Sequence, residues 1–325
     1  MRIVLTVVGL SLVEEVLNKN LVNLSGQVGA LPDVRPDSLR LALQRFEGNL
    51  PSLKRVRERP TSVHEDYAWQ CQERPGVAYL AAIQQALWRS PLDKKMKRDY
   101  TSAELASLSL LEPQLSQGDQ VWLLYSETPV GALCSAVLSE ILRQPGDGSE
   151  LCGPGVEVRQ RMLEGVQVDD PERLKEKGLL SWALVLEAAR KTACRTDDRV
   201  LLNITGGYKG LTPLAALLAF GLSEGGCPIE VFYLYEDSER LLRLPGSDLL
   251  HFDLSVFEQF AGDWQRLPAE GLPWSDHQDV LTSAFVDQVV NKRPDLFTTR
   301  ESRLELTVTG QLLLAVWRVR RGDTA

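Results

Sequence analysis

The sequence predicts an α/β fold, in which a mostly parallel sheet has helices on both faces and a small C-terminal domain follows. Three observations predict this fold class. Apolar, strand-like runs recur along the chain, each ends in a turn of glycines or hydroxyl residues, and apolar residues at helical spacing follow each turn. Strands that alternate with helices in this way pair in parallel, because each crossover helix returns the chain to the same end of the sheet.

The first predicted strand runs from Arg2 to Val8, because this stretch is apolar and rich in β-branched side chains. A first-strand turn, Gly9-Leu10-Ser11, follows it, and apolar residues then recur at helical spacing from Leu12 to Leu17. Ser11 has two interpretations that the sequence leaves open. Its hydroxyl either caps the helix or contacts a ligand.

A second unit starts at Arg199, where an apolar run leads into the glycine loop (Thr205 to Gly210) and then into a helix that ends at Leu222. The loop contains three glycines, one hydroxyl and the positive charge of Lys209. Glycines let the backbone approach a phosphate, and the free N–H groups at a helix start point toward it. The loop therefore predicts an anion-binding site.

A third unit starts with a buried strand from Gln120 to Tyr125 and continues through Ser126-Glu127-Thr128-Pro129 into a helix from Gly131 to Leu142. Ser126 or Thr128 can cap that helix, and Pro129 suits its first turn. Capping and ligand contact both remain open for these hydroxyls.

The three turns should meet at one edge of the sheet, because ligands of open parallel sheets bind beyond the carboxyl ends of the strands. The pattern differs from two common nucleotide motifs. No G-x-G-x-x-G follows the first strand, and no G-x-x-x-x-G-K-[ST] occurs in the chain.

The remaining elements complete the predicted domain plan. We expect a helix that Thr101 or Ser102 caps and that runs through Leu111, one or two short strands within 156–168, and a helix from Asp170 to Cys194 with a break near Gly178. A last good strand from Glu230 to Tyr235 and a further candidate strand within 304–308 complete the list. The predicted domains are 1–252, a proline- and glycine-containing linker at 253–276, and a small domain at 277–325 whose size is compatible with a winged helix.

The composition of the chain argues against several classes of binding partner. The net charge is −8, which argues against coating DNA or an anionic membrane through bulk charge. No run is long and uncharged enough to span a bilayer, and the N-terminus is a poor signal peptide. The five cysteines form no C-x-x-C pair, so we expect buried free thiols. These features predict a cytoplasmic protein without membrane contact, metal or cofactor.

Two strings carry a resemblance to CARF domains, the Rossmann-like sensor domains of type III CRISPR systems. Residues 6–12, Thr-Val-Val-Gly-Leu-Ser-Leu, look like the family's first-strand motif, and residues 203–210, Asn-Ile-Thr-Gly-Gly-Tyr-Lys-Gly, look like its glycine-loop motif. Thr101-Ser102-Ala103-Glu104 and Tyr125-Ser126-Glu127-Thr128 stand where the family has similar elements. The resemblance covers roughly residues 1 to 252.

The resemblance implies a ligand, a symmetry and an activity. The ligand is cyclic tetra-adenylate, held across a homodimer. The chain looks most like the standalone ring nucleases, which cleave the ring without a metal to linear products with a 2′,3′-cyclic phosphate and so switch off antiviral signalling. The implied catalytic residues are Ser11 and Lys209. The implied ligand-binding residues are Gly9, Leu10, Ser126, Glu127, Thr128, Asn203, Thr205, Gly206, Gly207 and Tyr208.

A sensor without catalysis is the alternative, with the ring controlling an output such as transcription. Arg59 and His64 match the spacing of a HEPN ribonuclease motif, which we interpret as coincidence, and no E-x-K of a restriction-type nuclease occurs. The cations at 318, 320 and 321 could touch DNA, but a solvated helix end is the favoured interpretation. DNA binding by the C-terminal domain is therefore the less favoured hypothesis.

Overall fold

A computed structural model describes the chain in segments. They are residues 1–9, 81, 101–143, 153–167, 170–193, 195–207, 209–223, 227–235, 238, 240–244, 252–268 and 271–322. The predicted helix after the first-strand turn and the Arg59–His64 pair lie outside these segments, as do Leu10, Ser11 and Tyr208.

A six-stranded sheet forms the centre of the molecule in the order β3-β2-β1-β4-β5-β6. The strands are β1 (Arg2–Val7), β2 (Gln120–Ser126), β3 (Glu157–Leu163), β4 (Arg199–Asn203), β5 (Ile229–Leu234) and β6 (Leu241–Leu244). Every pair is parallel except β5 with β6. The predicted α/β fold class is confirmed.

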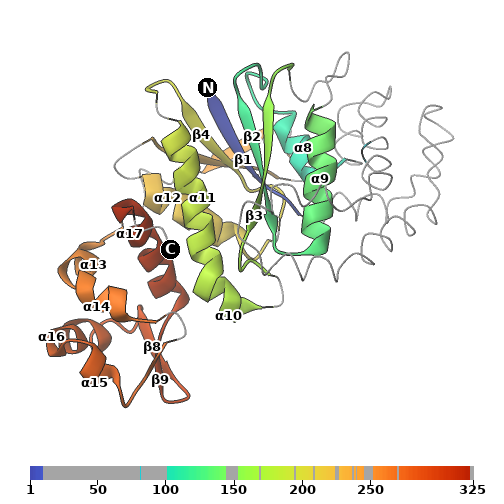
Figure 1. The fold of residues 1–325 in the computed structure, drawn as a ribbon. Helices are drawn as coiled ribbons and strands as arrows, with labels where there is room; N and C mark the ends of the chain where they lie inside the picture. The colour runs from blue at the N-terminus through green and yellow to red at the C-terminus, as the bar shows by residue number, and fades with distance from the viewer. Residues whose placement is uncertain are drawn as a thin grey trace.

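Helices cover both faces of this sheet (Figure 1). One face carries α8 (Ala103–Leu108) and α9 (Pro129–Arg143), and the other carries α11 (Leu179–Thr192) and α12 (Thr212–Ser223). Ser102, one of the two candidate caps, is the N-cap of α8, and its hydroxyl accepts from Leu105 N–H. The break expected near Gly178 is instead a π-helical segment, η2 (Leu174–Gly178), which joins α10 (Pro171–Arg173) to α11 with helical backbone angles throughout. Gly178 could end a helix in the left-handed conformation, but its φ of −61° is right-handed helical, so the chain continues into α11.

A small antiparallel sheet, in the order β7-β9-β8, organises the C-terminal residues. The elements are α13 (Ser255–Gln259), α14 (Ala261–Arg266), β7 (Leu272–Pro273), α15 (His277–Val280), α16 (Ser283–Phe285), η3 (Val286–Val290), β8 (Phe297–Arg300), β9 (Arg303–Leu306) and α17 (Val308–Arg321). This succession of helix, strand, two helices and a two-stranded hairpin is typical of a winged helix, the fold with which the size of the predicted C-terminal domain is compatible. The range 253–276, where we expect a linker, contains α13, α14 and β7, and Trp264 within it is fully buried. The division into domains stays a prediction.

The C-terminal elements share one hydrophobic core with the large sheet. Helix α17 packs against α11 and α12 (Figure 1). A Cβ on Gly221 of α12 would lie 3.0 Å from Val316 Cγ2, and the Arg320 guanidinium donates to the Gly221 carbonyl. Close packing along three helices therefore fixes the C-terminal unit to the helix that follows the glycine loop.

The strand expected from Glu230 to Tyr235 is β5, whereas β6, which follows it, was not predicted. Strand β6 has only four residues, Leu-Leu-Arg-Leu, and both central side chains are exposed, so it lacks the alternation that marks a half-buried strand. Strands β7 and β8 were not predicted either, since β7 has two residues and β8 is Phe-Thr-Thr-Arg with a single buried side chain. Among the described residues, every helix is too short or too polar to cross a membrane, and Cys134 and Cys227 are free thiols.

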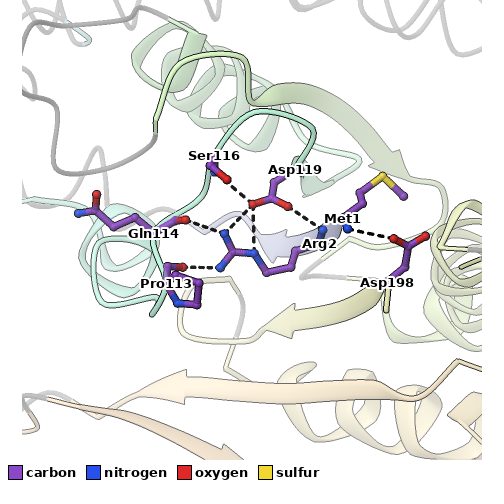
Figure 2. Close-up of polar contacts among 7 residues, drawn as sticks. All are labelled: Met1, Arg2, Pro113, Gln114, Ser116, Asp119 and Asp198. Atoms are coloured by element: carbon purple, nitrogen blue, oxygen red, sulfur yellow. Dashed lines mark hydrogen bonds and ion pairs between the residues drawn. The ribbon is translucent and has the colours of Figure 1, made fainter. Parts of the chain in front are cut away.

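A polar network fastens the start of β1 at the amino-terminal edge of the sheet. Figure 2 shows Arg2 surrounded by Asp119 and two backbone carbonyls. Asp119 accepts from Arg2 N–H at 2.7 Å and from the Arg2 guanidinium at 2.6 and 3.1 Å. Beside it, the amino group of Met1 lies 3.0 Å from Asp198 Oδ1. Burial raises the pKa of Asp119, but the hydrogen bonds from Arg2 outweigh this effect, so the net pKa lies below its usual value.

We expect Asp119→Asn to lower the free energy of unfolding by about 3 kcal/mol at neutral pH, because it leaves the Arg2 guanidinium partly buried without its charge partner. A carboxylate with a depressed pKa stabilises the fold above its unfolded-state pKa, and this contribution is lost as pH falls through the folded-state pKa. Urea unfolding of both proteins should therefore show a gap that is full at pH 7 and shrinks below about pH 4. Asp295→Asn, in an exposed pair with Arg293, is the control and should cost less than about 1 kcal/mol. A gap that stays constant down to pH 2 would contradict this account.

Candidate anion site between the first and fourth strands

The candidate site lies where the chain reverses its direction of travel across the sheet. After β1 the chain adds β2 and β3 on one side, then returns to pair β4 with the other side of β1. Such a switch point is where open α/β sheets bind ligands, beyond the carboxyl ends of the strands.

The first-strand turn and the glycine loop meet backbone to backbone at this point. A Cβ on Gly9 would lie 2.4 Å from the Gly207 nitrogen and 2.9 Å from its Cα. Gly207 itself has φ of +87°, and a Cβ there would lie 2.4 Å from Val7 Cγ1. Both positions thus require glycine, one for the close approach and one for its left-handed conformation as well. The structure brings these two predicted site residues together.

Lys209 lies in the same loop and is exposed to solvent, three residues before α12 begins at Thr212. Among the described residues, none accepts a hydrogen bond from the N–H of Gly206 or Gly207. A cation and amides of this kind near the start of a helix form a surface that favours a phosphate.

Asn203 and Thr205 hold the glycine loop in shape. The Asn203 amide is fully buried, donates to Ser107 Oγ at 2.7 Å, and accepts from Thr205 N–H at 3.1 Å and from Thr205 Oγ1 at 2.7 Å. Thr205 Oγ1 also accepts from Leu234 N–H at 2.9 Å. Both side chains therefore tie β4 to α8 and β5, a supporting role that is distinct from the ligand contact that the resemblance implies.

Ser126 is the last residue of β2, and Thr128 caps α9. Their hydroxyl oxygens are 2.9 Å apart, and Thr128 Oγ1 accepts from Gly131 N–H at 3.1 Å. Capping was one of the two interpretations that the sequence left open, and the structure provides its geometry.

Glu127 is directed toward the β3 side of the sheet. Its carboxylate is buried, accepts from Gly165 N–H at 3.0 Å and lies 3.0 Å from the Arg173 guanidinium. These bonds fasten the end of β2 to the loop after β3 and to α10. Within the described residues its contacts are thus structural, and a ligand contact stays a prediction.

Glu104 is the residue at this site to which sequence reasoning gave no role. It belongs to α8, its side chain is fully buried, and its Oε1 accepts from Gly9 N–H at 2.7 Å. The only sequence signal was its place in the string Thr101-Ser102-Ala103-Glu104, because a lone acidic residue in a short helix predicts a solvated position.

One comparison with known proteins identifies a family that part of the chain resembles. Residues 99–247 match the model of a family described as CRISPR-associated protein (Cas_APE2256), which is a family of CARF domains. The matched part contains β2 to β6, the glycine loop and Lys209, whereas β1 and the first-strand turn lie outside it. No curated protein matches the chain.

Proposed function

We propose that this protein is a ring nuclease of a CRISPR system, which binds cyclic tetra-adenylate across a homodimer and cleaves it without a metal ion. The products are linear oligoadenylates that end in a 2′,3′-cyclic phosphate, and their formation switches off the signal that the ring carries. The observation that carries the proposal is the contact of Gly9 with Gly207 at the switch point, with the exposed Lys209 in the same loop. The match of residues 99–247 to a CRISPR-associated family supports it.

The chemistry needs positioning and charge stabilisation more than it needs a strong base. A ribose 2′-hydroxyl attacks the adjacent phosphorus in line, forms the 2′-O–P bond and expels the 5′-oxygen of the next nucleotide. Negative charge accumulates on the phosphorane oxygens, where the Lys209 ammonium stabilises it. Ser11, two residues after Gly9, orients the 2′-hydroxyl or the phosphate from the first-strand turn. A well-oriented intramolecular attack of this kind gains a large part of its rate from geometry alone.

The symmetry of the ring accounts for the proposed dimer. Four phosphodiesters carry four negative charges, and one copy of the glycine loop supplies one lysine. Two copies related by a two-fold axis present the same groups to opposite sides of the ring, which is the self-complementary arrangement of a homodimer.

The test is to incubate the purified full chain with cyclic tetra-adenylate in EDTA and to resolve the products. We expect conversion to linear species with a 2′,3′-cyclic phosphate, and ring binding that saturates at one ring per two chains. Cyclic hexa-adenylate in a parallel reaction measures the preference for ring size. A ring that is bound tightly but survives an excess of enzyme for hours would overturn the nuclease proposal in favour of a sensor.

The sensor alternative has one structural observation in its favour, the winged-helix order of the C-terminal elements. The residues that would enter a groove of DNA argue against it. From Thr282 to Asn291, the segment of α16 and η3, the sequence contains no lysine or arginine, and Asp287 is exposed. DNA affinity comes largely from cations that meet phosphates, so this surface is a poor match. The test is a gel shift with the protein's own promoter region at physiological salt. A shifted band would favour the DNA-binding sensor over the ring nuclease.

A further inference from the structure

Glu104 lies at the junction of the two loops that form the candidate site. Its carboxylate has an exposed fraction of 0%. Oε1 accepts from Gly9 N–H at 2.7 Å, in the first-strand turn. On its other side is the glycine loop, where a Cβ on Gly206 would lie 2.1 Å from the same oxygen. One oxygen atom is therefore in contact with both loops.

The contacts of the Glu104 carboxylate can hold the two loops at a fixed separation. A buried carboxylate is costly unless hydrogen bonds compensate for its lost hydration, and a charged acceptor makes a short, strong bond with a backbone N–H. Gly206 must lack a side chain for the carboxylate to fit. A Cβ at this position would also lie only 2.7 Å from Val7 O, which is a second clash. The two residues are thus matched in shape, although 102 positions separate them along the chain.

The geometry points to Glu104 as the positioning residue of the site, which sets the separation between the first-strand turn and the glycine loop. This inference rests on the proposed function, because its consequence is kinetic. Ser11 belongs to one loop and Lys209 to the other. Loss of the carboxylate leaves the Gly9 N–H without its acceptor and opens space beside Gly206, so the two loops drift relative to each other. A displacement of about 1 Å costs on the order of 100-fold in the rate of an oriented reaction.

The proposed role of Glu104 is to position the two loops. Two variants distinguish this role from one that depends on the negative charge of the carboxylate. Glu104→Gln keeps an oxygen at the same reach and removes the negative charge, whereas Glu104→Asp keeps the charge and draws the oxygen back by one methylene. A positioning residue is rescued by Gln better than by Asp. A residue that transfers a proton, or that acts through its charge, is rescued by Asp better than by Gln.

Single-turnover cleavage and ring affinity should be measured for the full chain in each form. We expect Glu104→Ala to slow cleavage about 100-fold while the Kd of the ring changes less than about 10-fold, because the glycine loop itself stays in place. Glu104→Gln should recover most of the rate and Glu104→Asp little of it. Ser109→Ala, which removes the hydroxyl that donates to Ala106 O at the C-cap of α8, is the control for general loosening of that helix and should keep the wild-type rate.

A stability cycle tests the contact without any reference to cleavage. Gly206→Ala should lower Tm less in the Glu104→Ala background than in the wild type, because one of its two clashes has been removed. If the wild type cleaves the ring and folded Glu104→Ala cleaves it equally fast, or if Asp rescues better than Gln, the positioning role is overturned. A wild type that cleaves no ring overturns the proposed function instead, and in that case an additive stability cycle would overturn the contact as well.

Discussion

Lys209→Ala is expected to slow single-turnover cleavage of cyclic tetra-adenylate by about 100- to 1000-fold. The reason is the loss of a preorganised positive charge at the atoms where the transition state gains negative charge. Removing one such donor from an active site costs about 2.7–4 kcal/mol of transition-state stabilisation. Ring affinity should fall less, because the backbone amides of the glycine loop still face the phosphates and the ground state has less charge to stabilise. Quench-flow or manual time courses with excess enzyme measure the rate, and a fluorescence titration measures the affinity.

Two controls make the Lys209 result specific. Lys209→Arg keeps the charge but changes its shape, so it should retain an intermediate rate. Lys191→Ala removes an exposed lysine from the end of α11, near the amino-terminal edge of the sheet, and should leave the rate unchanged. If Lys209→Ala and Lys191→Ala lower the rate equally, the effect is one of net charge and Lys209 has no local role. Ser11→Ala, which alters the other loop, should slow cleavage as well.

The convergence of the first-strand turn and the glycine loop could be predicted from the sequence, because parallel strands place their carboxyl ends at one edge. The strand order in the structure adds what the sequence pattern could not predict, which is that β1 and β4 are direct neighbours. Strands β1 and β4 are sequence-distant neighbours, and nothing in the local sequence at Gly9 indicates that Gly207 will touch it. Both glycines were predicted as members of a ligand site, and that role stays a prediction, whereas the reason that each must be glycine is a tertiary contact.

Glu104 marks the limit of what the sequence could predict at the site. Periodicity assigns its helix, and the cap was predicted to be Thr101 or Ser102, but a single carboxylate carries no pattern that distinguishes a buried position from a solvated one. Its burial depends on a hydrogen bond to Gly9, 95 positions earlier. The same limit applies to Asn203, whose bond to Ser107 spans 96 positions. Short strands with exposed centres, such as β6, escaped prediction for a different reason, since pairing partners rather than side-chain alternation define them.

Gly9→Ala should have the largest effect of any single methyl group added at this edge of the sheet. Its Cβ would lie 2.4 Å from a backbone nitrogen and 2.9 Å from a backbone Cα, so no side-chain rotation can relieve the contact. The first-strand turn and the glycine loop must separate. Overpacking of this kind costs about 1–3 kcal/mol or more in stability, and the displaced loops should lose at least about 100-fold in the cleavage rate.

Gly262→Ala is the matched control for Gly9→Ala, because Gly262 lies in α14 and a Cβ there has no atom within 4 Å. A helical glycine of this kind gains about 0.4–1 kcal/mol on conversion to alanine, so the control should be as stable as the wild type or more so, with full activity. Thermal unfolding and ring cleavage of both variants give the comparison. The direct contact of the two loops would be contradicted by a Gly9→Ala protein that unfolds and cleaves like the wild type, since a methyl group cannot occupy the space that Gly207 fills. A Gly9→Ala protein that folds, binds the ring weakly and no longer cleaves it would support the proposal. That result would mean that the contact of Gly9 with Gly207 holds the site together and that the position of Lys209 depends on this contact.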